Sequence, residues 1–126
     1  MKIPVLLYHS ISDDNSNMSL NLNTFENQIM YLKKNDYTSI NFDEIDQNKK
    51  KQIIITFDDG YKDVFINALP ILKKYEFKAT CFLVTNLIGQ DNSWDIKNKK
   101  FSKKEIMNSN DINHWISSGM HIGSHS

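Results

Sequence analysis

The chain has 126 residues, of which 40% are hydrophobic and 11% aromatic, so it can build the core of one domain and is not expected to be disordered. Its basic residues are 15 lysines, which 15 acidic residues balance, so the charge indicates neither a nucleic acid nor an anionic membrane as a partner. Because the sequence contains no arginine, it offers no bidentate guanidinium group for a phosphate or a carboxylate. The single cysteine, Cys81, excludes an internal disulfide, and its apolar neighbours predict a buried thiol.

No apolar stretch is long enough to cross a membrane, and the apolar run at residues 3–8 is too short for a signal peptide. The sequence therefore predicts no transmembrane segment. Two locations stay open, namely the cytoplasm, or export by a signal that lies outside these residues.

Five short apolar runs predict strands. Three of them are nearly continuous in β-branched or aromatic residues and do not alternate with polar ones, a pattern typical of strands covered on both faces in a parallel sheet. The five runs are residues 3–8, 37–40, 52–57, 79–84 and 120–123.

Three helices are predicted between these runs from the helical spacing of apolar residues. Pro70 either interrupts the second helix or begins its second half. The third helix is expected to begin at Ser102, which has the capping-box spacing to Glu105, and to end at Gly119. The three helices span residues 24–35, 63–75 and 102–118.

Strands that alternate with helices predict an α/β protein with a parallel sheet or a barrel. The run at residues 120–123 has no covering helix after it, so the chain is interpreted as the first part of a longer domain.

The strand at residues 52–57 leads directly into Asp58, Asp59 and Gly60. Catalytic groups of parallel α/β folds gather at the carboxyl ends of the strands. Two neighbouring carboxylates repel each other unless a cation or hydrogen bonds compensate, so the pair suits a site in which one binds a metal and the other moves a proton. The alternative is an ordinary surface turn, since Asp-Asp-Gly is common in turns.

A second candidate feature is the segment from His121 to Ser126. If residues 120–123 form a strand, His125 lies at or just past its end, at the same edge as the two aspartates. Imidazole and carboxylate groups are frequent zinc ligands. The alternative here is a solvated tail.

Thr-Phe-Asp-Asp-Gly at residues 56–60, followed by Gly-Ser-His-Ser at residues 123–126, resembles the polysaccharide deacetylase family, the NodB-homology enzymes of carbohydrate esterase family 4. The resemblance extends over the whole chain, and residues 8–11 are similar to the opening of its biofilm-polysaccharide deacetylase branch. It implies a distorted (β/α) barrel, of which residues 1–126 form the N-terminal part. Further similar segments are residues 70–75, 78–84 and 113–125.

The resemblance also implies an activity, which is the metal-dependent hydrolysis of N-acetyl groups from a polysaccharide that contains N-acetylglucosamine. Asp58 is then the catalytic base, while Asp59 and His125 bind a divalent ion, with zinc expected. The family's second metal-binding histidine, the arginine that orients the base and the general-acid histidine have no counterpart in these residues, so the fragment itself is expected to be inactive. The resemblance places such an enzyme at the cell envelope or outside the cell.

The remaining histidines do not match the family's metal motif. His9 is expected to line the mouth of the site, and His114 to lie on an exposed helix face. His121 receives no role.

Two other functions compete with this one. Magnesium-dependent phosphatases also carry aspartates after an apolar strand, but their Asp-x-Asp spacing differs from that of the adjacent Asp58 and Asp59. A non-catalytic carbohydrate-binding or half-domain interaction module stays open, and zinc titration discriminates it from an enzyme. An incomplete barrel would expose two sheet edges, so self-association is also expected.

Overall fold

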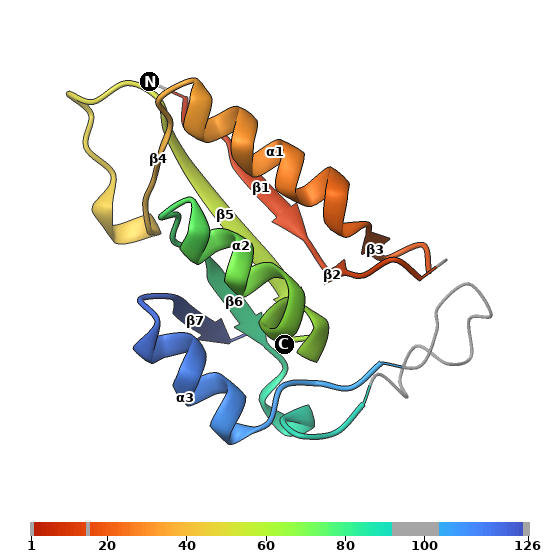
Figure 1. The fold of residues 1–126 in the computed structure, drawn as a ribbon. Coiled ribbons are helices and arrows are strands. Elements are labelled where there is room, and N and C mark those ends of the chain that lie inside the picture. Colours follow the sequence, from red (N-terminus) through yellow and green to blue (C-terminus); the bar gives the residue numbers. More distant parts are fainter. Residues whose placement is uncertain (1, 15, 92–103, 125–126) are drawn as a thin grey trace.

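A parallel sheet forms the centre of the molecule in the computed structural model, which describes residues 2–14, 16–91 and 104–124 (Figure 1). Its four main strands lie side by side in the order β1, β5, β6 and β7, and each pair is parallel. The predicted α/β class with a parallel sheet is confirmed. The strands are β1 (Val5–Tyr8), β5 (Gln52–Asp59), β6 (Thr80–Leu83) and β7 (His121–Ser124), with β4 (Thr38–Ser39) paired to the first residues of β5.

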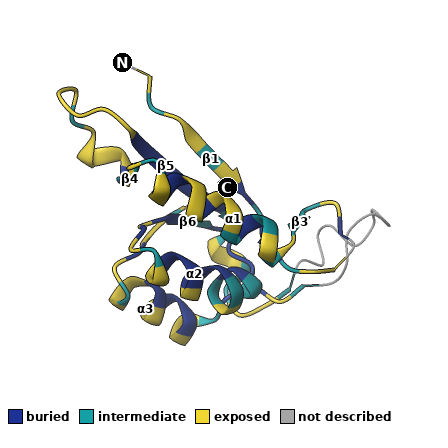
Figure 2. Cartoon of the chain, turned by 45° about the horizontal axis from the view of Figure 1, so that its top comes forward, coloured by how far each residue is buried: buried dark blue, intermediate teal, exposed yellow. Residues whose placement is uncertain are grey.

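Three α-helices cover one face of this sheet, as Figures 1 and 2 show from two directions. The first helix begins where the Asn21 side chain accepts a hydrogen bond from the Thr24 N–H at 2.8 Å, and it ends in two lysines, which suit the negative end of the helix dipole. The helices are α1 (Leu22–Lys34), α2 (Leu69–Lys74) and α3 (Ser109–Ser117). Within the described residues, no helix has the length and hydrophobicity that a membrane span requires.

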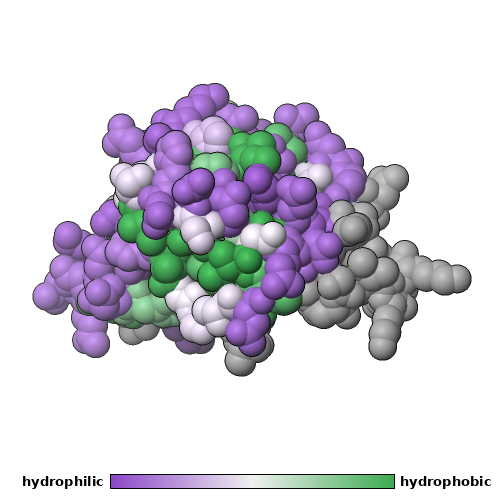
Figure 3. Space-filling model, turned by 90° about the horizontal axis from the view of Figure 1, so that it is seen from below, coloured by the Kyte–Doolittle hydropathy of each residue, from purple (hydrophilic) through white to green (hydrophobic). Residues whose placement is uncertain are grey.

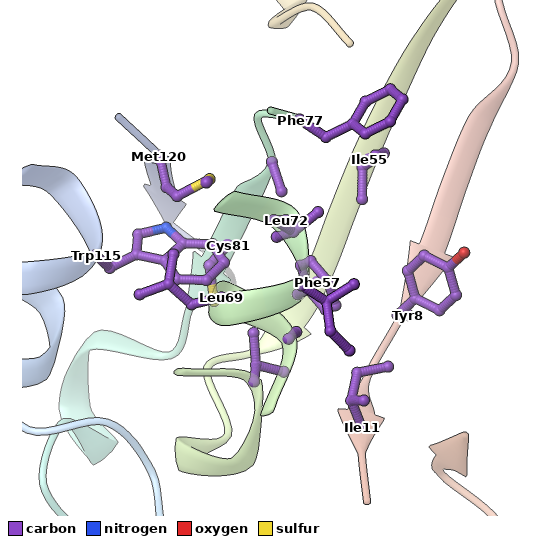
Figure 4. Close-up of a cluster of buried hydrophobic side chains, with 14 of the residues drawn as sticks. Tyr8, Ile11, Ile55, Phe57, Leu69, Leu72, Phe77, Cys81, Trp115 and Met120 are labelled. Atoms are coloured by element: carbon purple, nitrogen blue, oxygen red, sulfur yellow. The ribbon is translucent and has the colours of Figure 1, made fainter. Parts of the chain in front are cut away.

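The hydrophobic core lies between the helices and alternate residues of β5. Phe57 is fully buried and contacts the rings of Tyr8, Phe25 and Trp115, with centroid distances of 5.4, 5.8 and 6.0 Å. These aromatic contacts join β1, α1 and α3 to the central strand, and Figure 4 shows Tyr8, Phe57 and Trp115 in this cluster. Cys81 is buried in the same cluster, as its apolar neighbours predict.

The opposite face of the sheet is covered unevenly. β5 is largely buried, whereas β1 is largely exposed (Figure 2). Val5 and Leu7 of β1 are 49% and 57% exposed, although their register partners Ile54 and Thr56 are buried. Seen from below, the molecule shows hydrophobic side chains surrounded by hydrophilic ones (Figure 3). The described residues therefore leave part of their surface apolar.

The helix predicted at residues 63–75 is present in two parts. A π-helical turn, η2 (Val64–Ala68), continues directly into α2, and Pro70 lies in the first turn of α2. Pro70 thus begins the second half of the helix, which is one of the two predicted possibilities. A proline is tolerated there because the first N–H groups of a helix need no intrahelical partner.

The predicted start of the third helix is wrong. The helix begins at Ser109, after Asn108, whose side chain accepts from the Asp111 N–H while Asp111 accepts from the Asn108 N–H. The residues before Asn108 are extended because their backbone groups form hydrogen bonds with other segments instead of within a helix. For example, the Met107 N–H donates to the Gly60 carbonyl at 2.9 Å. Ser102 lies outside the described residues, and the predicted end at Gly119, with φ of 92°, is confirmed.

The loops add short elements around this framework. Directly after β1 lies β2, which pairs in parallel with β3 in a separate two-stranded sheet. These elements are β2 (Ser10–Ile11), β3 (Ser19–Leu20), η1 (Phe42–Glu44) and η3 (Thr85–Leu87).

Candidate active site at the carboxyl edge of the sheet

Asp58 and Asp59 are the last two residues of β5, and they lie beside Phe82 and Leu83 of β6 in the parallel register. The chain turns sharply after them, because Asp59 and Gly60 both adopt left-handed backbone angles, with φ of 75° and 73°. The strand therefore ends with both carboxylates at the edge where a parallel sheet presents its functional groups, as predicted.

His9 lies next to this pair. It follows β1 directly, and its Nε2 is 4.0 Å from an Asp58 carboxylate oxygen. The two side chains are 36% and 21% exposed, so a substrate or a water molecule can reach both. An imidazole beside an accessible carboxylate is a pair that can accept and donate protons.

The sequence reasoning placed His9 at the mouth of the site but assigned it no part in the chemistry. The signal that would have found it is its position: a histidine directly after the first strand reaches the same edge as residues directly after the third. The family's metal-binding motifs include Asp59 and His125 but not His9.

Asp59 is more enclosed than Asp58, being only 8% exposed as a residue. On the neighbouring strand, burial first and then the negative charges of Asp58 and Asp59 raise the pKa of the Cys81 thiol, while a hydrogen bond from the Gly60 backbone lowers it, and the net result is about 12. The thiol therefore stays protonated at neutral pH. The thiolate, which is the form that binds metals and acts as a nucleophile, is therefore disfavoured at this position.

The carboxyl end of β7 arrives at the same edge. Ser124 pairs with Leu83, which in turn pairs with Asp59, so the ends of β5 and β7 are separated by one strand, or about 10 Å. The predicted ligand His125 follows Ser124 and lies outside the described residues.

Gly123 of β7 is needed for close packing within this edge. A Cβ atom at Gly123 would lie 2.6 Å from two ring carbons of Phe82, whose register partners are Gly123 and Asp58. The Phe82 ring thus packs directly against Gly123.

The described residues contain no group of three histidine, cysteine or acidic side chains that would bind a metal by themselves. The donor types fit a divalent ion nevertheless: Asp59 supplies a carboxylate at the site edge, and an imidazole after Ser124 would complement it. Of the predicted ligands, Asp59 is the one whose position the structure describes.

Two other histidines lie away from this edge. His114 is exposed on α3, as predicted, with its ring 5.5 Å from that of Phe65. His121 begins β7, at the opposite end of that strand from Ser124, and its Nε2 lies 2.5 Å from the Asn41 side-chain nitrogen.

Comparison with known proteins agrees with this geometry. A Bacillus subtilis protein named as a polysaccharide deacetylase, YxkH, is 42% identical over 70% of this chain and 34% of its own length. The poly-beta-1,6-N-acetyl-D-glucosamine N-deacetylase of Staphylococcus aureus (strain MSSA476) is 35% identical over 80% of this chain and 36% of its own length. The chain thus spans about a third of the length of these relatives.

A solved structure shares the fold over the entire chain. The Streptococcus pyogenes deacetylase PplD, solved in complex with acetate, superimposes with a TM-score of 0.79 at 27% identity, covering 100% of this chain and 57% of that one. The family model described as "Polysaccharide deacetylase" matches residues 45–126, which include Asp58 and Asp59. The chain therefore belongs to the polysaccharide deacetylase family.

Proposed function

We propose that the protein containing this chain removes acetyl groups from the amide nitrogens of a polysaccharide that contains N-acetylglucosamine, with the help of a divalent metal ion, for which zinc is expected. The observation that carries the proposal is the meeting of Asp58, Asp59 and His9 at one accessible sheet edge. Two relatives support it by their names, one as a poly-N-acetylglucosamine N-deacetylase and one as a deacetylase in complex with acetate.

Asp59 and His125 are the residues that would hold the ion. When bound, a divalent ion supplies Lewis acidity, polarising an amide carbonyl and lowering the pKa of a water molecule. Asp59 suits this role because it is the more buried aspartate, and a carboxylate in such surroundings is favoured when a cation compensates it.

Asp58 would accept the proton of the water that attacks the acetyl carbonyl carbon. Its side chain is 21% exposed, so the water can approach it directly. Breaking the carbon–nitrogen bond then requires a proton on the leaving nitrogen. The resemblance implied a general-acid histidine outside these residues, but we propose that His9, which lies beside Asp58, delivers this proton. The products are acetate and a polysaccharide with a free amine.

Residues 1–126 alone are proposed to be inactive, since Asp59 and His125 provide two ligands where catalytic zinc sites commonly have three from the protein. We also propose that the whole protein works at the cell envelope or outside the cell, where such polysaccharides lie.

The test is acetate release from poly-N-acetylglucosamine oligomers by the whole protein, after chelation and again after zinc is restored. Release that depends on the ion and is lost in Asp58→Asn would support the proposal. Binding of the oligomers with neither acetate release nor zinc binding would favour a carbohydrate-binding module instead.

A further inference from the structure

The segment that follows His9 is held by the helical turn that follows the two aspartates. The Ser10 hydroxyl donates to Oδ2 of Asp63 at 2.5 Å, and the Ile11 N–H donates to Oδ1 of the same carboxylate at 3.1 Å. Asn67 adds a third contact, because its side-chain N–H donates to the Ile11 carbonyl at 2.8 Å. Asp63 therefore uses both oxygens on two consecutive residues of β2.

These contacts are shielded from water. Ser10 and Ile11 are completely buried, and the Asp63 side chain is 17% exposed. Hydrogen bonds to an ionised group in such surroundings are stronger than hydrogen bonds between neutral groups. The hydrogen bonds of Asp63 and Asn67 with Ser10 and Ile11 are called the clamp below. The clamp is therefore expected to be more rigid than a contact between exposed loops.

Lys104 compensates the charge of the Asp63 carboxylate. Its Nζ lies 3.0 Å from Oδ2 of Asp63, and it also pairs with Asp14. Burial lowers the pKa of Lys104, but the hydrogen bonds and charges of Asp14 and Asp63 raise it more, so the net direction is upward and the amine stays charged. Asp63 thus has a cationic partner within hydrogen-bond distance.

The clamp joins the two chain segments that follow the members of the proton-transfer pair, His9 and Asp58. His9 immediately precedes Ser10, and Asp63 is the fourth residue after Asp59. The hydrogen bond between Ser10 and Asp63 therefore limits how far His9 can move from Asp58. A carboxylate oxygen of Asp58 lies 4.0 Å from Nε2 of His9.

We propose that Asp63 is a positioning residue that holds His9 against Asp58 through Ser10 and Ile11. The proposal deepens the proposed function and rests on it, because it assigns to His9 a part in the reaction. Asp63 acts through the backbone that carries His9 rather than on the substrate.

The first test needs no activity. In the whole protein, Asp58→Asn is expected to shift the side-chain NMR signals of His9 at fixed pH, because the two groups are neighbours. In the Asp63→Ala background the same substitution should shift them by less than half as much. An equal shift in both backgrounds would overturn the proposal.

Two further variants keep this test decisive. Ser10→Ala removes one hydrogen bond of the clamp and should weaken the coupling even where Asp63→Ala fails to fold. Asp14→Asn is the matched control, because it removes a partner of Lys104 without touching Ser10 or Ile11, and it should leave the coupling unchanged.

The second test is kinetic. Asp63→Ala should lower kcat/KM for deacetylation by up to about 10²-fold, the cost of a small misplacement, with metal content unchanged. The loss should vanish in a His9→Gln background, since a residue that acts through His9 has nothing left to position. A loss that persists there would overturn the proposal. Absence of acetate release in the wild type would instead overturn the proposed function, and the NMR coupling would still decide the role of Asp63.

Discussion

A Cβ atom on Gly60 would lie 2.6 Å from Cδ2 of Leu83, closer than any real contact. The turn that ends β5 is therefore pressed against β6, and with φ of 73° it is also in the left-handed region. Glycine meets both demands, and it lets the chain turn directly after the two aspartates.

Replacing Gly60 by alanine is expected to destabilise the fold by about 2–4 kcal/mol, because backbone strain and overpacking add. Gly119 is the matched control: its φ is 92°, but no atom lies within 4 Å of its Cβ position, so Gly119→Ala should cost only the strain, about 1–2 kcal/mol. Urea denaturation of both variants measures the difference. Equal losses would show that the contact with Leu83 is not tight.

The two aspartates should separate by function. In the whole protein, Asp59→Asn should weaken metal binding at least about 10-fold, because a neutral amide replaces a charged ligand. Asp58→Asn should retain the metal and lose turnover by about 10²–10⁴-fold, because it removes the base. Metal content and acetate release measure both effects.

Opposite results would reverse these roles. If Asp58→Asn loses the metal and Asp59→Asn keeps it, Asp58 is the ligand and Asp59 the base. If both variants keep metal and activity, the deacetylase mechanism proposed for this site is wrong.

His9→Gln should lower deacetylation by about 10²–10⁴-fold without changing metal content, because glutamine forms hydrogen bonds but transfers no proton. His114→Gln is the control, since His114 lies exposed on α3 and away from the edge. Wild-type activity in His9→Gln would exclude His9 from the reaction and leave the proton for the leaving nitrogen to another group.

The strands were largely predictable from the sequence because continuous apolar runs leave few alternatives for a short chain. The run at residues 52–57 became the largely buried strand β5, and the acidic pair after it reached the expected edge. The start of the third helix was predicted wrongly because Ser102 and Glu105 have the spacing of a helix N-cap. In the structure the Met107 N–H instead donates a hydrogen bond to the Gly60 carbonyl, which keeps this segment out of the helix. Such long-range competition leaves no trace in local spacing.

The site was predictable only where a motif marked it. Asp58 and Asp59 carry a recognisable pattern, but the proximity of His9 depends on β1 and β5 being neighbours in the sheet. Asp63 resembles an ordinary helix-capping acid in the sequence, and its contacts with Ser10 and Ile11 join residues far apart in the chain. Only the folded chain reveals that clamp.

Residues 1–126 expressed alone are expected to self-associate, because Val5 and Leu7 remain about half exposed along β1. Leu7→Lys should shift the population toward monomers by placing a charge on this strand. Met30→Lys serves as the control, because Met30 is exposed on α1 and does not line the groove beside Leu7. Sedimentation at micromolar concentration measures the change. A monodisperse wild-type monomer would contradict the expectation.

The ion pair between Asp14 and Lys104 should make stability depend on acid pH. Partial burial raises the pKa of Asp14, but the hydrogen bond from Lys104, those from Ser19 and Ser16, and the Lys104 charge lower it more, to about 2 from the ordinary 3.8. Because the folded-state pKa is the lower one, this contribution is complete above pH 3.8 and is lost as the pH falls toward 2. The free energy of unfolding should therefore fall more steeply between pH 4 and pH 2 in the wild type than in Asp14→Asn, and Lys104→Met should flatten the same part of the profile. Denaturation at several pH values measures these slopes, and parallel profiles for all three proteins would show that the pair contributes nothing to stability.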